Sequence, residues 1–166
     1  MLKSKLSVSK VEKDKFRFTG VDIEKTKDGI TISMEDYAKS LEFVDEIRDA
    51  KGDESLTKTE MQIYRKFTGK ISWLAANTRP DLAITALIMS KKNSNATIKD
   101  LKKINKVIEK IRAKPCRVNF TKIGNKEDLI LLGITDASYK SDEKSISGTI
   151  VMLGNVKNEN VIPIFW

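Results

Sequence analysis

The sequence predicts an α+β fold made of a β-hairpin, then four helices, then an antiparallel group of strands. Three features of the hydrophobic pattern support this order. Apolar and polar residues alternate in residues 16–33, apolar residues recur every three or four positions in residues 33–114, and alternation returns from residue 116. With 166 residues, 40% of them hydrophobic, the chain can bury a core as one domain or two small ones.

The first element is a hairpin. The segments FRFTGVDIE (16–24) and GITIS (29–33) both alternate apolar and polar residues, and the pair Asp28-Gly29 lies where they meet. An Asp-Gly pair between two alternating segments is a strong signal for a tight hairpin turn. We therefore predict two paired strands near the start of the chain.

The first two helices are predicted from stripes of apolar residues. The first covers SMEDYAKSLEFVDEIRDA (33–50), in which Ser33 followed by Asp36 resembles a helix N-cap with an acid at its third position. The second begins near Thr57 or Thr59 and continues through EMQIYRKFTGKISWLAANT. Their inward stripes consist of Tyr37, Leu41, Val44 and Ile47 in the first helix and Ile63, Phe67, Ile71 and Leu74 in the second.

The next two helices follow a break at Asn77 to Arg79. Pro80 suits the first turn of the third helix, PDLAITALIMSKK, which is apolar on nearly every side and is expected to be the central buried helix. The fourth helix (98–114) is amphipathic and ends before Pro115. Its inward stripe is predicted to consist of Leu101, Ile104, Ile108 and Ile111.

Four strands are predicted after Pro115, joined by short polar turns. They are residues 116–123, 129–137, 145–153 and 160–166. The chain thus divides into a hairpin region (1–34), a helical region (35–115) and a C-terminal sheet (116–166).

Positive charge is concentrated in the middle of the chain. Residues 51–120 carry 16 Lys/Arg against 6 Asp/Glu, a net charge of +10, whereas residues 1–50 (10 against 11) and 121–166 (5 against 6) each carry −1. Such a basic block favours polyanions, because neutralising phosphates releases their condensed counterions. A solvated helical face on a basic protein would produce the same pattern.

Composition also limits which catalytic residues the chain can use and where in the cell we expect it to be. The chain has no histidine and a single cysteine, Cys116, so histidine-based catalysis and an internal disulfide are excluded. No secretory signal is present, and no apolar run approaches the roughly 18 residues that a membrane span needs. We expect no membrane association and an intracellular location, cytoplasmic or nuclear.

A hydrolytic metal site on this chain would have to be built from carboxylates, which suit Mg²⁺. Asp136 is the first candidate because it follows a hydrophobic strand, and Asp142 and Glu143 lie in the turn beyond it. Alternatively, Asp136 caps a strand end and the other two acids solvate a turn.

An ordered series of segments resembles the polymerase polyprotein of copia-type retrotransposons. YRKFTGKISWLAANTRPDLAITALIMSK (64–91) resembles a helical segment of that family, which reads Tyr-Arg, Gly-Lys, an aromatic-Leu pair and Thr-Arg-Pro-Asp. FTGVDIEKTKDGITISMEDYAKSLE (18–42) resembles the hairpin and helix upstream, and LKKINKVIEKIRAK (101–114) the helix downstream. ITDASYKSDEKSISGTIVMLGN followed by VIPIFW resembles the opening of the family's ribonuclease H domain.

The resemblance implies a fragment or remnant of a reverse transcriptase. The hairpin would be the end of the palm, the helices the thumb or connection, and the last three strands the first three of a ribonuclease H fold. The Asp-Asp pair of the polymerase site does not occur, so we expect no polymerase activity. The family's thumb tracks the backbone of a template–primer or RNA–DNA duplex. The basic residues that would do so here are Arg65, Lys66, Lys70, Arg79, Lys102, Lys103, Lys106 and Lys110. Alternatively, these residues serve solubility, with Arg79 paired to Asp81 in a loop.

By the same resemblance, Asp136 would be the first metal-binding carboxylate of the ribonuclease H site. The family's other acids lie beyond the third strand, and the sequence ends at Trp166, so Asp136 is expected to be vestigial. No cofactor is expected, and Mg²⁺ would bind only if other acids completed the site. The first strand of an incomplete sheet would also present an unpaired edge, which a protein partner or a second copy would cover.

Two alternatives remain open. The chain could be a domesticated structural or interaction subunit without catalysis, and the initiating Met1 favours such a free-standing polypeptide. It could also be an active nuclease whose missing acids come from a second chain.

Overall fold

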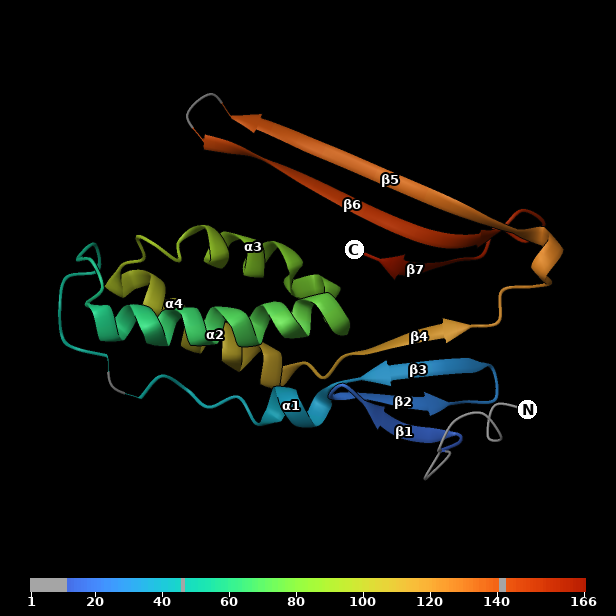
Figure 1. Cartoon of the computed structure of the whole chain (residues 1–166), viewed down its shortest axis with the longest axis horizontal. Helices are drawn as coiled ribbons and strands as arrows, with labels where there is room; N and C mark the ends of the chain where they lie inside the picture. Colours follow the sequence, from blue (N-terminus) through green and yellow to red (C-terminus); the bar gives the residue numbers. More distant parts are fainter. Residues whose placement is uncertain (1–11, 46, 141–142) are drawn as a thin grey trace, which may run out of the picture.

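The computed structural model describes residues 12–45, 47–140 and 143–166, without the side chains of residues 138–140 and 143–145. A four-stranded sheet adjoins one end of a helical layer, and a three-stranded sheet extends over that layer (Figure 1). The predicted α+β class with antiparallel strands is therefore confirmed.

The N-terminal sheet has the order β1-β2-β3-β4, with every neighbouring pair antiparallel. Its strands are β1 (Lys15–Phe18), β2 (Val21–Lys25), β3 (Gly29–Ser33) and β4 (Arg117–Thr121). The strand predicted over 16–24 is in fact two strands, because Thr19 and Gly20 have φ angles of 47° and 84° and form a two-residue turn. The predicted turn at Asp28-Gly29 joins β2 to β3, as expected.

The position of β4 differs from the expected grouping of residues 116–166 into one sheet. β4 pairs with β3, with Phe120 opposite Ile30 and Val118 opposite Ile32. A period-two pattern predicts a strand but not its partner, and the side chains of β3 provide the apolar match. The C-terminal sheet consequently begins at Leu129.

The helix predicted over 33–50 is much shorter than expected. α1 covers only Glu35–Lys39, and Met34 precedes it without a side-chain cap, so the predicted cap at Ser33 is wrong. The described residues after Ser40 are irregular, yet Leu41 and Val44 reach the core with 1% and 6% exposure. The Asn105 amide donates to the Val44 carbonyl (3.0 Å) and accepts from its N–H (2.8 Å), so a side chain replaces the missing helical hydrogen bonds.

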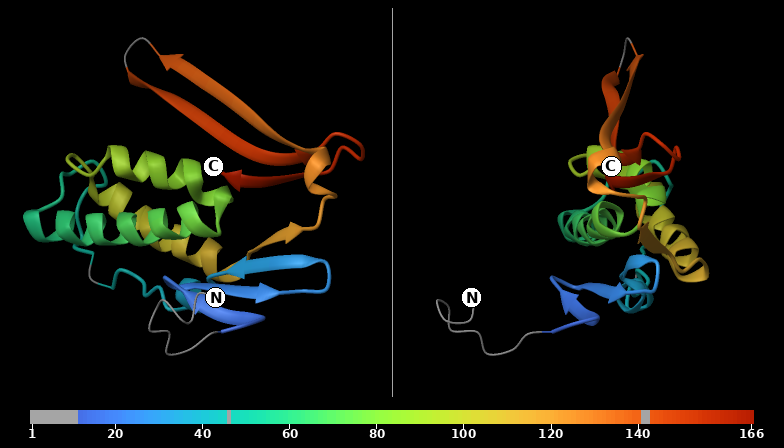
Figure 2. Two further views of the ribbon diagram at one scale, coloured as in Figure 1. Left: turned by 45° about the vertical axis from the view of Figure 1, so that its right-hand side comes forward. Right: turned by 90° about the vertical axis from the view of Figure 1, so that its right-hand side faces the viewer.

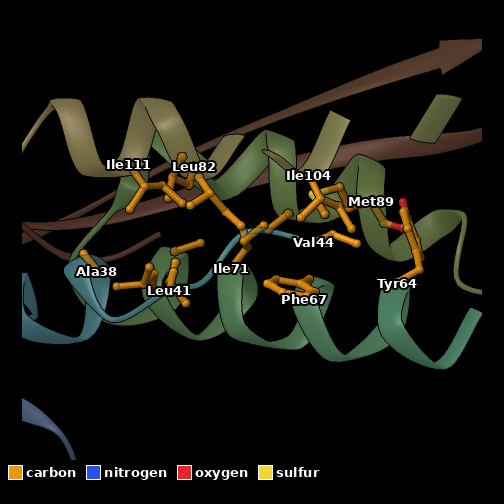
Figure 3. Close-up of a cluster of buried hydrophobic side chains, with 14 of the residues drawn as sticks. Ala38, Leu41, Val44, Tyr64, Phe67, Ile71, Leu82, Met89, Ile104 and Ile111 are labelled. Carbon is orange, nitrogen blue, oxygen red and sulfur yellow. The ribbon is translucent and has the colours of Figure 1, made fainter. Parts of the chain in front are cut away.

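The helical layer consists of α2 (Lys58–Asn77), the short turn η1 (Pro80–Leu82), α3 (Ala83–Lys91) and α4 (Ile98–Ala113). Capping boxes start α2 (Thr57 with Glu60) and α4 (Thr97 with Asp100). Figure 3 shows side chains of α2 and α4 meeting in the core. The predicted stripes of both helices are confirmed, apart from Ile63, which is half-buried. The fully buried members are Ile71, Leu74, Leu101, Ile104, Ile108 and Ile111.

α3 is not the central buried helix that its sequence predicted. Only Ala86 and Met89 are buried, whereas Ile84, Leu87 and Ile88 are 54%, 37% and 49% exposed. A helix that is apolar on all sides carries no stripe to show which face turns inward. The structure places α3 on the same side of the layer as the C-terminal sheet (Figure 1).

The C-terminal sheet has the order β5-β6-β7. Its strands are β5 (Leu129–Lys140), β6 (Glu143–Asn155) and β7 (Val161–Phe165), and the turn η2 (Lys126–Asp128) leads into it. Within the described residues β5 has a neighbour on one side only, so the expected unpaired edge is present. No helix in the described part of the chain has the length and apolar character needed to cross a membrane.

Candidate nucleic-acid interface

The outward face of α4 carries the clearest basic row in the molecule. Because α4 buries one stripe completely, its opposite face is directed to solvent, and four of the predicted residues lie there. Lys99 belongs to the same face and was missed, although its spacing of three, four and seven residues from the others would have revealed it. The exposed row therefore comprises Lys99, Lys102, Lys103, Lys106 and Lys110. It extends about 16 Å along the helix at 1.5 Å per residue.

Few acids neutralise this row. Asp100 is 5% exposed and is shared between Lys92 (2.7 Å) and Lys103 (3.5 Å), so Lys103 is partly engaged. Burial alone would raise the pKa of Asp100, but hydrogen bonds from Lys92 and Thr97 outweigh burial and hold that pKa below its ordinary value. Glu109 is the other acid on the exposed part of α4. The face therefore keeps a strong excess of positive charge.

The residues of α4 that could read base edges are turned away from this face. Asn105 is bonded to the Val44 backbone. Arg112 donates to the Leu41 carbonyl and lies 4.6 Å from the Phe43 ring centroid. The α4 row thus presents ammonium groups alone, which contact phosphates and carry no base-specific pattern.

A second basic row lies on α2. Lys66 and Lys70 are one turn apart, and Lys70 lies 5.2 Å from the Phe67 ring centroid. Arg65 is on another part of the helix surface, where its Nε–H donates to the Asn93 carbonyl (2.7 Å). Trp73 is 44% exposed and stands one turn beyond Lys70. Sequence reasoning missed this indole, and the Lys-x₃-Lys-x₂-Trp spacing was the available signal.

The backbone of α2 is open between these side chains. A Cβ added at Gly69 would meet no atom within 4 Å, so a ligand can approach the helix closely there. An exposed indole beside cations suits nucleic acid, because phosphates attract the cations and bases pack against the ring.

The two rows do not form one continuous surface. α2 and α4 bury their apolar stripes against each other, as Figure 3 shows, so their outward faces point in different directions. In the right-hand view of Figure 2 the two helices lie on opposite flanks of the helical layer. The predicted lysines of α2 and α4 therefore lie in two separate sites.

Arg79 belongs to neither row, and its assignment to nucleic-acid binding is corrected by the structure. Its side chain is 4% exposed, and its Nε and one terminal nitrogen donate to the Asp81 carboxylate at 2.8 Å each. Its other terminal nitrogen donates to the carbonyls of Ile111 (3.4 Å) and Lys114 (3.1 Å) at the end of α4. The bond to Asp81 raises the pKa of Arg79 and lowers that of Asp81. Arg79 joins η1 to the last turn of α4, which is a structural role.

Asp136 lies on β5 and is exposed. It borders a groove between α3 and the C-terminal sheet. Asp142 and the side chain of Glu143 lie outside the described residues. Among the described side chains, no group of three or more Asp, Glu or Cys is close enough to hold a metal ion. Asp136 alone does not supply the carboxylate cluster that a pair of Mg²⁺ ions requires.

Comparison with protein families, with characterised proteins and with solved structures finds no match to this chain.

Proposed function

We propose that this chain binds the sugar–phosphate backbone of a nucleic-acid duplex, as the thumb or connection part of a copia-type reverse transcriptase would. The observation that carries the proposal is the lysine row of α4, whose five exposed ammonium groups face two acids, one of them buried. Lys66, Lys70 and Trp73 of α2 provide a second contact surface. Polymerisation is not part of the proposed function, because the chain contains no Asp-Asp pair.

The proposed binding is indifferent to base sequence. The α4 row offers lysines alone, so the free energy comes from released counterions and the affinity falls steeply with salt. We expect RNA–DNA hybrid and DNA duplex to bind with the same salt dependence. The ribonuclease H activity of the family is not part of the proposed function, because no cluster of acids surrounds Asp136 among the described side chains.

Fluorescence anisotropy of a labelled RNA–DNA hybrid, titrated at roughly 50 and 200 mM salt, tests the proposal. Replacing Lys102, Lys106 and Lys110 with Ala removes three exposed cations without breaking the helix, since Ala is the best helix former. We expect at least about tenfold weaker binding at low salt, and a slope of log affinity against log salt that is lower by about 2–3.

The matched control replaces Lys27, Lys122 and Lys126 with Ala. These residues are equally charged and exposed but lie outside both rows. We expect its affinity to stay within about twofold of the parent chain. Equal losses in the two triple variants would mean that net charge, and not the α4 row, drives binding. A parallel incubation with Mg²⁺ should leave the hybrid intact, and cleavage abolished by Asp136→Asn would contradict the proposal.

A second candidate function is that of a structural or interaction subunit. It is favoured by the unpaired edge of β5 together with the exposed apolar residues of the C-terminal sheet, among them Leu131 and Ile134 at 67% and 57% exposure. Absence of binding to duplex even at low salt would select this function over the first.

A further inference from the structure

An apolar groove separates α3 from the C-terminal sheet. It encloses about 1180 Å³, part of it open to solvent. Ile84 and Leu87 line the α3 wall, and Ile134, Ile150 and Phe165 line the sheet wall. These five side chains are between 37% and 60% exposed. Two apolar surfaces that face each other across water gain free energy if they close together.

A single short segment of backbone, around Lys122 and Ile123, connects the C-terminal sheet to the rest of the chain. The N–H of Lys122 donates to the Asp28 carbonyl (2.9 Å) and so belongs to the N-terminal sheet. The carbonyl of the next residue, Ile123, accepts from Asn158 Nδ2 (3.1 Å) in the turn between β6 and β7. The chain therefore passes from one unit to the other between residues 122 and 123. We call the unit that begins there the C-terminal arm (residues 123–140 and 143–166).

The residues just after the crossing are fixed to the arm itself. Asp128 binds Lys157 Nζ (2.8 Å) and its carbonyl accepts from the Val156 N–H (3.1 Å). Gly124 has a φ angle of +144°, and a Cβ there would collide with the Asn155 amide. The contacts of residues 123 to 128 therefore lie within the arm up to the crossing point.

Trp166 holds the other end of the arm against α2. Its Nε1–H donates to the Ala75 carbonyl (2.8 Å) in the last turn of that helix. This carbonyl is available because the Arg79 N–H, its regular partner in a helix, bonds to the Leu74 carbonyl instead. The indole borders the groove beside α3 and also a smaller one, about 540 Å³, beside Ile32 and Phe120 of the N-terminal sheet. It therefore keeps the arm between two apolar surfaces.

We propose that the C-terminal arm pivots between residues 122 and 123 and that Trp166 is the latch that sets its resting position. When the latch opens, the arm closes onto α3, and Ile134, Ile150 and Phe165 cover Ile84 and Leu87. The device does not depend on nucleic-acid binding, which uses the outward faces of α2 and α4.

Distances between spin labels test the latch in the full chain. Labels on Gln62→Cys of α2 and Thr135→Cys of β5 occupy exposed positions, and Cys116→Ser removes the native thiol. With the latch intact we expect one dominant distance. Trp166→Phe keeps an aromatic ring but removes the donor, so the closed population should rise about two- to tenfold, as for the loss of one hydrogen bond.

Trp73→Phe is the matched control, because it makes the same substitution at the chain's other tryptophan, outside the arm. It should leave the distance distribution unchanged. Equal urea midpoints for the two variants would exclude loss of fold as the cause. A Trp166→Phe distribution identical to that of the parent, or a parent without a dominant distance, would overturn the latch.

A separate variant tests whether the arm closes onto α3. Adding Ile84→Gln and Leu87→Gln to the Trp166→Phe chain makes the α3 wall polar, and the population of the closed distance should then fall back toward the parent value. No change would overturn closure onto α3. Failure of the anisotropy experiment would leave these distances unaffected, so the two proposals are tested separately.

Discussion

The helical layer and the C-terminal sheet contain the same kinds of apolar side chain but differ in what covers them. Ile71, Ile104 and Ile108 in the layer are fully buried, whereas Leu131 and Ile134 in the sheet are 67% and 57% exposed. Hydrophobic stabilisation scales with the apolar area removed from water. The helical layer is therefore stabilised by its own buried core. The three-stranded sheet leaves apolar side chains exposed and depends for its stability on another surface that covers them.

The largest expected effect comes from the same substitution made in both regions. Ile104→Ala empties a fully buried position between α2 and α4 and should lower the free energy of unfolding by about 2–5 kcal/mol. Ile134→Ala removes a side chain that is 57% exposed and should cost less than about 1 kcal/mol. Urea unfolding at constant pH measures both values. Equal losses would show that the sheet face is covered in solution and would remove the contrast between the regions.

The second-largest expected effect concerns Arg79, which joins η1 to the last turn of α4 at one end of the helical layer. Arg79→Ala leaves the Asp81 carboxylate and the carbonyls of Ile111 and Lys114 without their donor, so we expect a loss of about 2–3 kcal/mol. Arg65→Ala is the matched control, because Arg65 is exposed and bonds one carbonyl, and it should cost less than about 0.5 kcal/mol. Thermal and urea unfolding compare the two variants. A stable Arg79→Ala chain with weakened duplex binding would reverse our assignment of this residue.

The contrast between the two regions also explains which parts of the fold the sequence could predict. The amphipathic stripe of α4 and the turn at Asp28-Gly29 are local signals, and both were predicted correctly. The predictions that α3 is centrally buried and that β4 belongs to the C-terminal sheet were wrong for the same reason. The hydrophobic pattern of a segment predicts helix or strand, but not which element packs or pairs with it. The partner is decided by tertiary contacts, such as Ile30 with Phe120.

For a similar reason, the sequence predicted the positions of only some residues of the candidate interface. The lysines of α4 could be placed on one face because they are complementary to a clear apolar stripe. For Arg79 the sequence offered the ion pair with Asp81 only as an alternative, and its other partners, Ile111 and Lys114, are more than 30 residues away and could not be predicted. The irregular path at Val44 was equally hidden, because it depends on the side chain of Asn105.

The smallest expected effect is pH-dependent and acts on the helical layer alone. Hydrogen bonds from Lys92 and Thr97 hold the pKa of Asp100 below its ordinary value of 3.8 in the folded chain. The unfolded chain therefore binds more protons between these two pKa values, and stability rises with pH there. The contribution of Asp100 is fully present above the unfolded pKa and is lost as the pH falls through the folded one.

Asp100→Asn tests this sign directly. At pH 7 the variant loses the charge that binds Lys92 and keeps one acceptor oxygen in place of the two that serve Lys92 and Thr97, so we expect a loss of about 1–2 kcal/mol. At an acidic pH low enough to protonate the parent carboxyl as well, the difference between the two chains should nearly vanish. Asp45→Asn, at an exposed acid, serves as the control and should differ from the parent by less than about 0.5 kcal/mol at both pH values.

A constant penalty for Asp100→Asn at both pH values would mean that the shape of the cap, and not its charge, stabilises α4. A pH-dependent penalty would instead assign the acid sensitivity of the helical layer to a residue that contributes nothing to the C-terminal sheet.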